Sequence, residues 1–487
     1  MRPRSTAALR AGILAAHLSL VLAGTALAQS ATMPDDQQTA ASQPRLNPDG
    51  ERDATDPAAD DQAADDSPPF ATDIRSSIDP SDALDEQALQ ELRRQNMREA
   101  TVDRLSTRTT DGRNDAQGVR VGSFILRPSI TETIGSERTT TGNDSTTRTY
   151  LRSGLKASLT SDWSLHQLRI DAEGSWDKTL SGIRSDDPEG KIQAQLRLDL
   201  SDETTATLKA GYSLQHEDIG DPNAVANAAT QADVNEYTAG LDVMRDLGVI
   251  RTTVGLDVTR QVYGDAVLAN GDRLSQSERD SNTGRIRGRL GYELSPALIP
   301  FLEASYGRTI YDEHRDSLGY VRDADLYALK AGIETDFGEK LKGELAGGYL
   351  IADFDDPALR SISAATIDGS ALWSPYRGTD VSLNLRTTIE PTTTPGASGS
   401  TAYTGTTVLS QVILQNLTGQ VSGGLTLRDY SQESIPFQTV LTLGTGLTWG
   451  ISRSLDLNAD VTWERTRQDG VASLEVLRAG IGLTLKR

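Results

Sequence analysis

The segment Leu455–Glu464, with the sequence LDLNADVTWE, decides the fold of this chain. Its residues alternate strictly between two faces. Polar residues occupy one face, and the other face carries Leu455, Leu457, Ala459, Val461 and Trp463. Successive side chains of a β-strand point to opposite sides, so this period of two predicts a strand with one apolar and one charged face. Such a strand suits a barrel wall that has lipid outside and water inside.

Similar short zigzag segments follow one another from Val119 to the last residue, the first of them near 119–135 and 146–160. We count about 18, and the connections between them alternate between very short and long. Bacterial outer-membrane barrels have an even strand number, short periplasmic turns and longer outer loops. The sequence therefore predicts an all-β fold, a transmembrane antiparallel up-and-down β-barrel over 119–487. Both barrel ends fall on the short-turn side, which predicts that the preceding chain lies in the periplasm.

The outward face of the predicted wall can be followed through its apolar residues. One strand presents Ile192, Ala194, Leu196, Leu198 and Leu200. Aromatic residues of the same parity near strand ends predict the girdles that meet lipid headgroups: Trp176, Tyr292, Tyr306, Tyr349, Trp373, Trp449 and Trp463. Aromatic residues make up only 5% of the chain, which is low for two such girdles.

The first 28 residues are typical of a secretory signal peptide. Arginines at positions 2, 4 and 10 precede the apolar run 11–26, and small residues lead to a cleavage site after Ala28. The alternative is an uncleaved anchor, but the apolar run is short for a membrane helix. We therefore expect an exported protein.

Residues 29–118 form an acidic segment before the barrel. Residues 29–79 are rich in Asp, Ala, Gln, Ser and Pro and hold few large apolar groups, so we expect a mostly disordered periplasmic tail. Within it, Ser81 and a stripe of leucines predict one short helix near 81–105. This helix is either a solvated spacer or a docking helix or plug for the barrel.

The composition excludes several classes of function. The net charge is −21, which argues against a nucleic-acid partner because that partner requires a concentrated basic surface. The chain has no cysteine, so it folds without disulfides or thiolate metal sites. Its four histidines form no metal-binding pair and no catalytic triad. We expect no enzyme activity and no cofactor; His216 with Asp218 is the only fragment of a catalytic set.

Charged residues on the predicted inward face are the candidates for solute selectivity. They are Arg285, Arg287, Arg289, Asp456, Asp460 and Glu464. A wide barrel leaves water in its lumen, so we expect these groups to stay solvated and to tune which ions pass. The three arginines could favour anions at a constriction, or they could pair with wall carboxylates such as Glu303.

Acidic residues also collect in the predicted outer loops. Asp353, Asp355 and Asp356 lie in one loop, and Asp186 with Asp187 in another. These carboxylates could gather divalent cations, although solvated loop charge is the simpler interpretation.

The stretch Arg120–Gly135, RVGSFILRPSITETIG, resembles the first strand of the outer-membrane β-barrel porin (type 2) family of Gram-negative bacteria. The preceding polar tail and the strand-rich remainder fit the same resemblance. It implies a barrel in the outer membrane, with membrane lipids as neighbours. The resemblance supplies no substrate and no catalytic residues.

The end of the chain resembles the signal that the barrel assembly machinery recognises. Polar Arg478 and Gly480 precede apolar Leu483 and Leu485, although the chain ends in Lys486-Arg487 and not in an aromatic residue. We expect this segment to direct insertion through that partner.

Two functional hypotheses follow from the predicted barrel. The first is a porin for passive diffusion of small hydrophilic solutes. The second is an occluded barrel with an export, assembly or surface-binding role that uses its periplasmic tail. Association of three barrels, as many porins form, is left open.

Overall fold

A computed structural model describes residues 118–182, 188–217, 223–225, 228–268, 270–392, 398–432 and 434–487. The predicted signal peptide, acidic tail and short helix near 81–105 lie outside these residues. Within them, no helix is long and apolar enough to cross a membrane.

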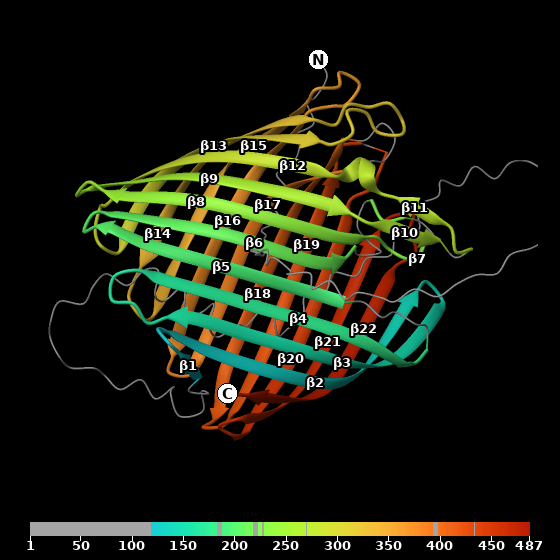
Figure 1. Cartoon of the computed structure of the whole chain (residues 1–487). Helices are drawn as coiled ribbons and strands as arrows, with labels where there is room; N and C mark the ends of the chain where they lie inside the picture. Colours follow the sequence, from blue (N-terminus) through green and yellow to red (C-terminus); the bar gives the residue numbers. More distant parts are fainter. Residues whose placement is uncertain are drawn as a thin grey trace, which may run out of the picture. The chain divides into compact units, whose positions relative to one another are not determined.

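Eighteen antiparallel strands of the described residues form one closed wall (Figure 1). Each wall strand pairs with the wall strands before and after it in the chain, and the last strand, β22, pairs back with β2. The predicted barrel and its strand number are confirmed. The wall consists of β2 (Phe124–Thr141), β3 (Asp144–Ser161), β4 (Gln167–Ser181), β5 (Pro188–Ser201), β6 (Thr204–His216), β8 (Asp233–Asp246), β9 (Ile250–Tyr263), β12 (Ser281–Tyr292), β13 (Leu298–Tyr311), β14 (Ala324–Asp336), β15 (Leu341–Phe354), β16 (Ile362–Tyr376), β17 (Thr379–Pro391), β18 (Gly399–Leu414), β19 (Leu417–Tyr430), β20 (Gln438–Ser452), β21 (Leu455–Gln468) and β22 (Leu474–Lys486).

The seam between β2 and β22 is a long, regular pairing. It runs from Ser129 opposite Lys486 to Thr141 opposite Leu474. Beyond the end of β22, the short strand β1 (Val119–Val121) pairs with the first residues of β2. A continuous seam leaves no open edge in the wall, and lipid requires this because it cannot hydrogen-bond backbone groups.

The two ends of the barrel differ in their connections, as the sequence predicts. At the short-turn end, tight turns join strands such as β5 to β6 and β20 to β21. At the long-loop end, longer connectors join pairs such as β6 to β8 and β9 to β12. Figure 1 shows β1 and the C-terminus at the short-turn end, and the loop strands β7, β10 and β11 at the other.

Some details at the long-loop end depart from the sequence prediction. β2 continues well past the predicted end at 135 and β3 begins just before the predicted start at 146, so the two strands meet in a tight turn, where Gly142 has a φ of 59°. Both faces of this extension are polar, so it lacks the alternation that marks the other strands. The sequence also gave no signal for the loop sheet of β7 (Ala228–Thr230), β10 (Asp265–Leu268) and β11 (Arg273–Ser275), or for the 3-10 turn η2 (Ser277–Arg279).

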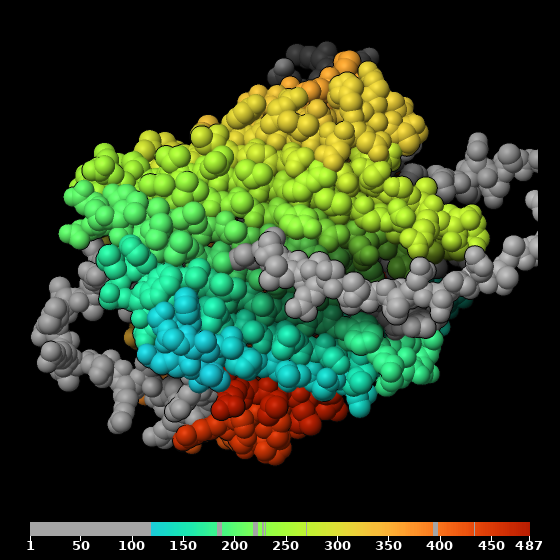
Figure 2. All heavy atoms as spheres, in the orientation of Figure 1, coloured from blue at the N-terminus to red at the C-terminus, as the bar shows by residue number. Residues whose placement is uncertain are grey.

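The predicted outward face is exposed on the outside of the wall. Leucines and isoleucines of outward parity are typically about half exposed; Leu329 reaches 64%. Figure 2 shows the outer surface of the green and yellow strands as closely packed side chains. Six of the seven predicted girdle aromatics are among the exposed large residues: Trp176, Tyr292, Tyr306, Tyr349, Trp373 and Trp449.

Candidate functional site: the lumen wall and the long-loop mouth

Two arginines of the predicted ladder on β12 pair with carboxylates on other strands. Arg287 Nη2 donates to Asp242 of β8 at 2.6 Å. Arg289 contacts Glu303 of β13 at 2.8 Å and Glu344 of β15 at 2.7 Å. The positive charges of Arg287 and Arg289 are therefore largely neutralised at the wall, as the pairing alternative predicts.

Arg285 differs from the other two arginines of the ladder. It forms no hydrogen bond or ion pair with another residue of the described ranges. Its neighbour on β13 is Gly307, which has no side chain, and its neighbour on β9 is Asp257. Arg285 is thus the member of the ladder whose charge is available to a solute.

Ion pairs between non-adjacent strands recur around this part of the inner wall. Arg251 of β9 reaches Glu334 of β14 at 3.2 Å, although β12 and β13 lie between them. Lys330 of β14 likewise contacts Asp368 of β16 at 2.7 Å. These side chains lie across the inner surface, so much of the lumen charge on β8–β16 is paired.

The inner surface of β18–β20 has a different character. Among its described inward positions the single charged residue is Arg428. Hydroxyl side chains dominate the rest of this surface: Thr404, Thr406, Ser410, Thr418, Ser422, Thr426, Thr442 and Thr448. The lumen wall therefore combines a charged sector with an uncharged, hydroxyl-lined one. Sequence reasoning missed this second sector, although the Thr/Ser/Gly alternation of these strands could have indicated it.

The acidic candidates of β21 face inward but are not freely solvated. Asp456 is 8% exposed and lies 2.7 Å from Lys486 Nζ, and Glu464 is 1% exposed. Asp460 lies beside Gly480, where a Cβ atom would come within 3.2 Å of its carboxylate. The expectation that inward charges stay solvated is therefore wrong for Asp456 and Glu464, because tertiary packing encloses them.

A chain of charged residues crosses the seam on the inner surface. Arg478 of β22 donates to Glu137 of β2 at 3.0 Å, and Arg148 of β3 lies 3.4 Å from the same carboxylate. Arg148 also contacts Asp177 of β4 at 3.3 Å, and Arg152 contacts Asp177 at 2.7 Å. Both acids are only 3% exposed. The predicted assembly residue Arg478 thus joins the last strand to the first.

The other predicted assembly residues divide between the two faces of β22. Gly480 faces inward, and a Cβ atom there would lie 3.0 Å from Thr133 Cγ2 of β2. Leu483 and Leu485 face outward and are 48% and 57% exposed. The two leucines are therefore accessible on the lipid side of the folded wall.

At the long-loop mouth, buried ion pairs tie neighbouring loops together. Arg279 of η2 binds both carboxylate oxygens of Glu217, which follows β6, and the two residues are 5% and 7% exposed. Arg322, in the β13–β14 loop, donates to Asp316 at 2.7 Å and also to the backbone carbonyl of Thr392. These contacts hold the described loop segments against one another.

One described contact joins distant parts of the rim. Asn223, in the β6–β8 loop, donates from Nδ2 to the carbonyl oxygen of Pro391 at 3.0 Å. Pro391 ends β17, and many strands separate β17 from β6 and β8 in either direction around the wall.

The acidic loop before β16 is engaged in contacts with the protein. Asp355 binds Arg308 at 2.6 Å, and Asp356 accepts a hydrogen bond from the backbone N–H of Val321 at 2.9 Å. No arrangement suited to a metal ion occurs among the described residues. Asp353 accepts a hydrogen bond from Ser361 Oγ, so all three carboxylates of the expected cation site contact other protein groups. Asp186 and Asp187 lie outside the described residues.

Two loop carboxylates have shifted pKa values. The guanidinium of Arg260, which binds Asp312 at 2.5 and 2.7 Å, holds the pKa of that carboxyl below its usual range. Backbone N–H groups of Val321 and Ala358 similarly lower the pKa of Asp356. Both carboxylates are therefore ionised at neutral pH and keep their loop contacts.

The histidine considered for catalysis forms an ordinary loop contact. Nδ1 of His216 pairs with the carboxylate of Asp233, the residue opposite it on β8. Asp218, its expected partner, lies outside the described residues.

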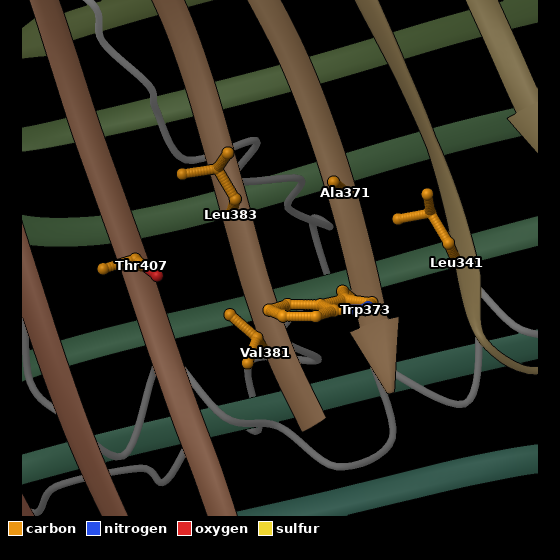
Figure 3. Close-up of a pocket in the computed structure, with 6 residues that line it drawn as sticks. All are labelled: Leu341, Ala371, Trp373, Val381, Leu383 and Thr407. Carbon is orange, nitrogen blue, oxygen red and sulfur yellow. The ribbon is translucent and has the colours of Figure 1, made fainter. Parts of the chain in front are cut away.

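The outer wall carries one shallow apolar groove of about 330 Å³ (Figure 3). It lies over β15–β18, and its lining is almost entirely apolar: Leu341, Ala371, Trp373, Val381, Leu383 and Thr407. All six residues have outward parity, so the groove faces lipid and does not communicate with the lumen.

A model of the family described as "Putative beta-barrel porin 2" matches residues 113–487. No curated protein matches the chain. Among solved structures, similarity extends to the FrpB iron transporter from Neisseria meningitidis (F5-1 variant), with 8% identity over 74% of this chain and 82% of that chain and a TM-score of 0.40.

Two similar structures come from Pseudomonas aeruginosa. The outer membrane protein OpdK has 11% identity over 74% of this chain and 99% of its own, with a TM-score of 0.38. OccK2 (OpdF) has 12% identity over 74% and 98%, with a TM-score of 0.40. These similarities are too distant to assign a solute.

Proposed function

This chain belongs to the beta-barrel porin 2 family of outer-membrane barrels, and from that premise we propose that it lets small hydrophilic solutes diffuse passively through its lumen. The observation that carries the proposal is the closed wall of 18 strands with a polar inner surface. Barrels of this strand number are wide enough to hold an aqueous channel. In this proposal the chain has no catalytic activity and uses no cofactor.

The proposed orientation places the short-turn end in the periplasm. Short periplasmic turns and long outer loops are the rule for bacterial barrels. Residues 1–28 would then be removed as a signal peptide, residues 29–118 would form a periplasmic tail, and residues 119–487 would form the membrane domain. Insertion would require the barrel assembly machinery, with Leu483 and Leu485 as part of its signal.

Solute selectivity would depend on the free charge in the lumen. Arg287 and Arg289 are paired with carboxylates, so Arg285 is the candidate for attracting anions. The opposing hydroxyl-lined sector of β18–β20 can hydrogen-bond neutral polar solutes without charge selection. The proposed channel therefore has a weak preference for anions. Asp456, Asp460 and Glu464 would act mainly through the pairing of the wall.

A second candidate function is an occluded barrel with an export, assembly or surface-binding role. The hydrogen bond from Asn223 to Pro391 and the contact of Arg322 with Thr392 favour it, because they tie described loop segments together at the mouth. In that case, the periplasmic tail would be the segment through which the protein binds its partners.

Single-channel recording in planar bilayers distinguishes the two functions. The comparison uses the mature protein and a variant that lacks residues 29–118. We expect steady conductance from both proteins. Conductance only from the shortened variant would make the tail a gate, and silence of both would support the occluded barrel. Heat-modifiable migration on gels confirms that each sample contains folded barrel.

A further inference from the structure

Positive charge gathers on the outer wall beside the seam of the barrel. Near the long-loop end of β21, β22, β2, β3 and β4, the charged residues of outward parity are four exposed cations and one acid. The cations, which we call the seam patch, are Arg138, Lys178, Arg465 and Arg467. The acid is Glu475, which pairs with Arg465 at 3.4 Å.

The other three cations of the seam patch have no carboxylate partner among the described residues. Lys178 and Arg467 form no hydrogen bond or ion pair with those residues. Arg138 makes one long contact, 3.5 Å from its Nη2 atom to Ser145 Oγ. The seam patch therefore holds three positive charges that form no ion pair with the described residues, in a chain whose net charge is −21.

Elsewhere on the described wall strands, the outward cations near the long-loop end are paired with acids. Arg260 of β9 binds Asp312 at 2.5 and 2.7 Å. Arg308 of β13 binds Asp355 at 2.6 Å and Asp325 at 3.2 Å. Unpaired outward positive charge is thus a property of the seam and not of the whole rim.

Further acids on this side of the barrel form no ion pair with the seam patch among the described residues. They are Asp144 beside the β2–β3 turn, Asp429 on β19 and Asp469 in the loop after β21. Glu132 of β2 also has outward parity, but it lies further toward the short-turn end. There it accepts a hydrogen bond from Ser153 Oγ at 2.9 Å.

The seam patch borders the apolar band of the wall. Lys178 follows Trp176 by two residues on β4, and Arg465 follows Trp463 by two residues on β21. Tryptophan rings prefer the boundary between acyl chains and headgroups, and Lys and Arg side chains reach from that boundary toward water. The cations of the seam patch are therefore at the level of lipid headgroups.

The spacing of the cations suits more than one phosphate group. Lys178 is in register with Leu151 of β3, and Leu151 is in register with Ile134 of β2, so Lys178 and Arg138 are two strands and four residues apart. Strands lie about 4.8 Å apart and rise about 3.3 Å per residue, which separates the two Cα atoms by roughly 16 Å. A headgroup with two phosphates reaches both side chains without requiring each to extend fully toward the other.

We propose that the seam patch binds a phosphorylated glycolipid of the outer leaflet, with a phosphate at each end of its sugar headgroup. The phosphates would contact Arg138, Lys178 and Arg467, because a phosphate beside an unpaired Lys or Arg is favourable at a membrane surface. The acyl chains would lie against apolar residues of the same wall, such as Ile134 and Leu155, which are 61% and 55% exposed.

The assignment to the outer leaflet rests on the orientation proposed above, with the long loops outside. Lipid binding itself does not depend on solute passage, because the seam patch lies on the outside of the wall. The two proposals can therefore fail separately: conductance tests the lumen, and lipid binding tests this face.

Native mass spectrometry of the folded mature protein in detergent tests the proposal, with diphosphoryl lipid A as the probe. We expect one lipid A molecule per barrel. Dephosphorylated lipid A, which keeps the acyl chains, should bind at least about ten-fold more weakly because it offers no charge to the cations. Phosphatidylglycerol, with its single phosphate, should also bind more weakly, and excess inorganic phosphate should not displace lipid A.

Substitutions in the seam patch separate its charge from general lipid adhesion. Arg138→Gln combined with Lys178→Gln should weaken lipid A binding about 30-fold, since each cation near a membrane surface contributes a factor of about five. Arg138→Lys combined with Lys178→Arg keeps both charges and should retain binding. The control Arg260→Gln with Arg308→Gln removes two outward cations that have acidic partners, and it should leave the affinity unchanged. Heat-modifiable migration confirms that each variant is folded.

Several results would overturn the proposal. Dephosphorylated lipid A or phosphatidylglycerol could bind as tightly as diphosphoryl lipid A, or inorganic phosphate could displace it. Equal losses of affinity in the seam and control variants would also contradict it, as would undiminished binding by the neutral seam variant. The same holds if the charge-preserving variant loses as much affinity as the neutral one.

Discussion

Charge in the lumen depends on which neighbour each side chain meets. On β12, three arginines at a spacing of two point the same way, yet among the described residues only two of them form ion pairs. Gly307 on the neighbouring strand offers no partner to Arg285. At the residue scale, selectivity therefore concerns the one arginine of this ladder that forms no ion pair with the described residues.

We predict that Arg285→Ser lowers the preference of the channel for anions. The stability of the barrel should stay unchanged, because Arg285 forms no hydrogen bond or ion pair with the described residues that the substitution would remove. Reversal potentials in a salt gradient measure the first effect, and the temperature of heat-modifiability measures the second. Arg285→Lys, which keeps the charge, is the matched control and should behave like the unmodified protein. An unchanged reversal potential for Arg285→Ser would remove this residue from the selectivity proposal.

At the element scale, the barrel depends on the seam between its first and last strands. The backbone pairing of β2 with β22 closes the wall, and the inner charges from Arg478 to Arg152 extend that connection onto β3 and β4. Because Glu137 and Asp177 are almost fully buried, an unpaired charge here would be costly. β22 is thus joined to β2 by side-chain ion pairs as well as by backbone hydrogen bonds.

We predict that Arg478→Leu lowers the free energy of unfolding by about 1–3 kcal/mol, because the buried carboxylate of Glu137 then loses its contact with Arg478 at 3.0 Å. Urea unfolding in detergent measures this loss. Arg197→Leu is the control, since Arg197 pairs with Asp199 on its own strand and is far more exposed; its removal should cost about 0–1 kcal/mol. Equal losses for the two variants would contradict a special role of the seam.

A second prediction at this scale concerns the loop before β16. In the folded state, Asp356 accepts hydrogen bonds from two backbone N–H groups, and these bonds lower its pKa. Its carboxylate therefore binds a proton less readily than in the unfolded chain. The link to Val321 is therefore fully present above the ordinary aspartate pKa of about 3.9 and is lost as the pH falls through the lower folded value.

Hydrogen exchange of the Val321 amide, corrected for the intrinsic rate at each pH, measures this link. We expect its protection to weaken as the pH falls below about 4 and to disappear only as the pH passes through the lower folded pKa of Asp356. In Asp356→Asn, protection should be weaker and independent of pH over the same range. Protection that persists unchanged to pH 2 would show that the carboxylate does not hold the loops together.

At the scale of the whole molecule, one closed wall separates three environments. The outward apolar band meets lipid, the inner surface meets the lumen, and the loops gather at one end (Figure 1). Closure makes this arrangement stable without disulfides, because every wall strand has a hydrogen-bonded neighbour on both sides. The conductance comparison of full-length and shortened protein belongs to this scale, since it tests the lumen as a unit.

The sequence by itself determined the strands of the wall, their number and the face that each of their side chains occupies. These properties follow from a period of two, which is local: Leu457 and Asp456 take opposite sides whatever their strand pairs with. The same parity placed Arg285, Arg287 and Arg289 inward together.

Only the tertiary structure decided which of these arginines form ion pairs. The partners of Arg289 lie 14 and 55 residues away along the chain, and Arg478 meets Glu137 across a separation of 341 residues. Such contacts depend on register, strand tilt and closure of the wall, which local alternation does not encode. For the same reason, the loop sheet of β7, β10 and β11 became visible only when distant strands were side by side.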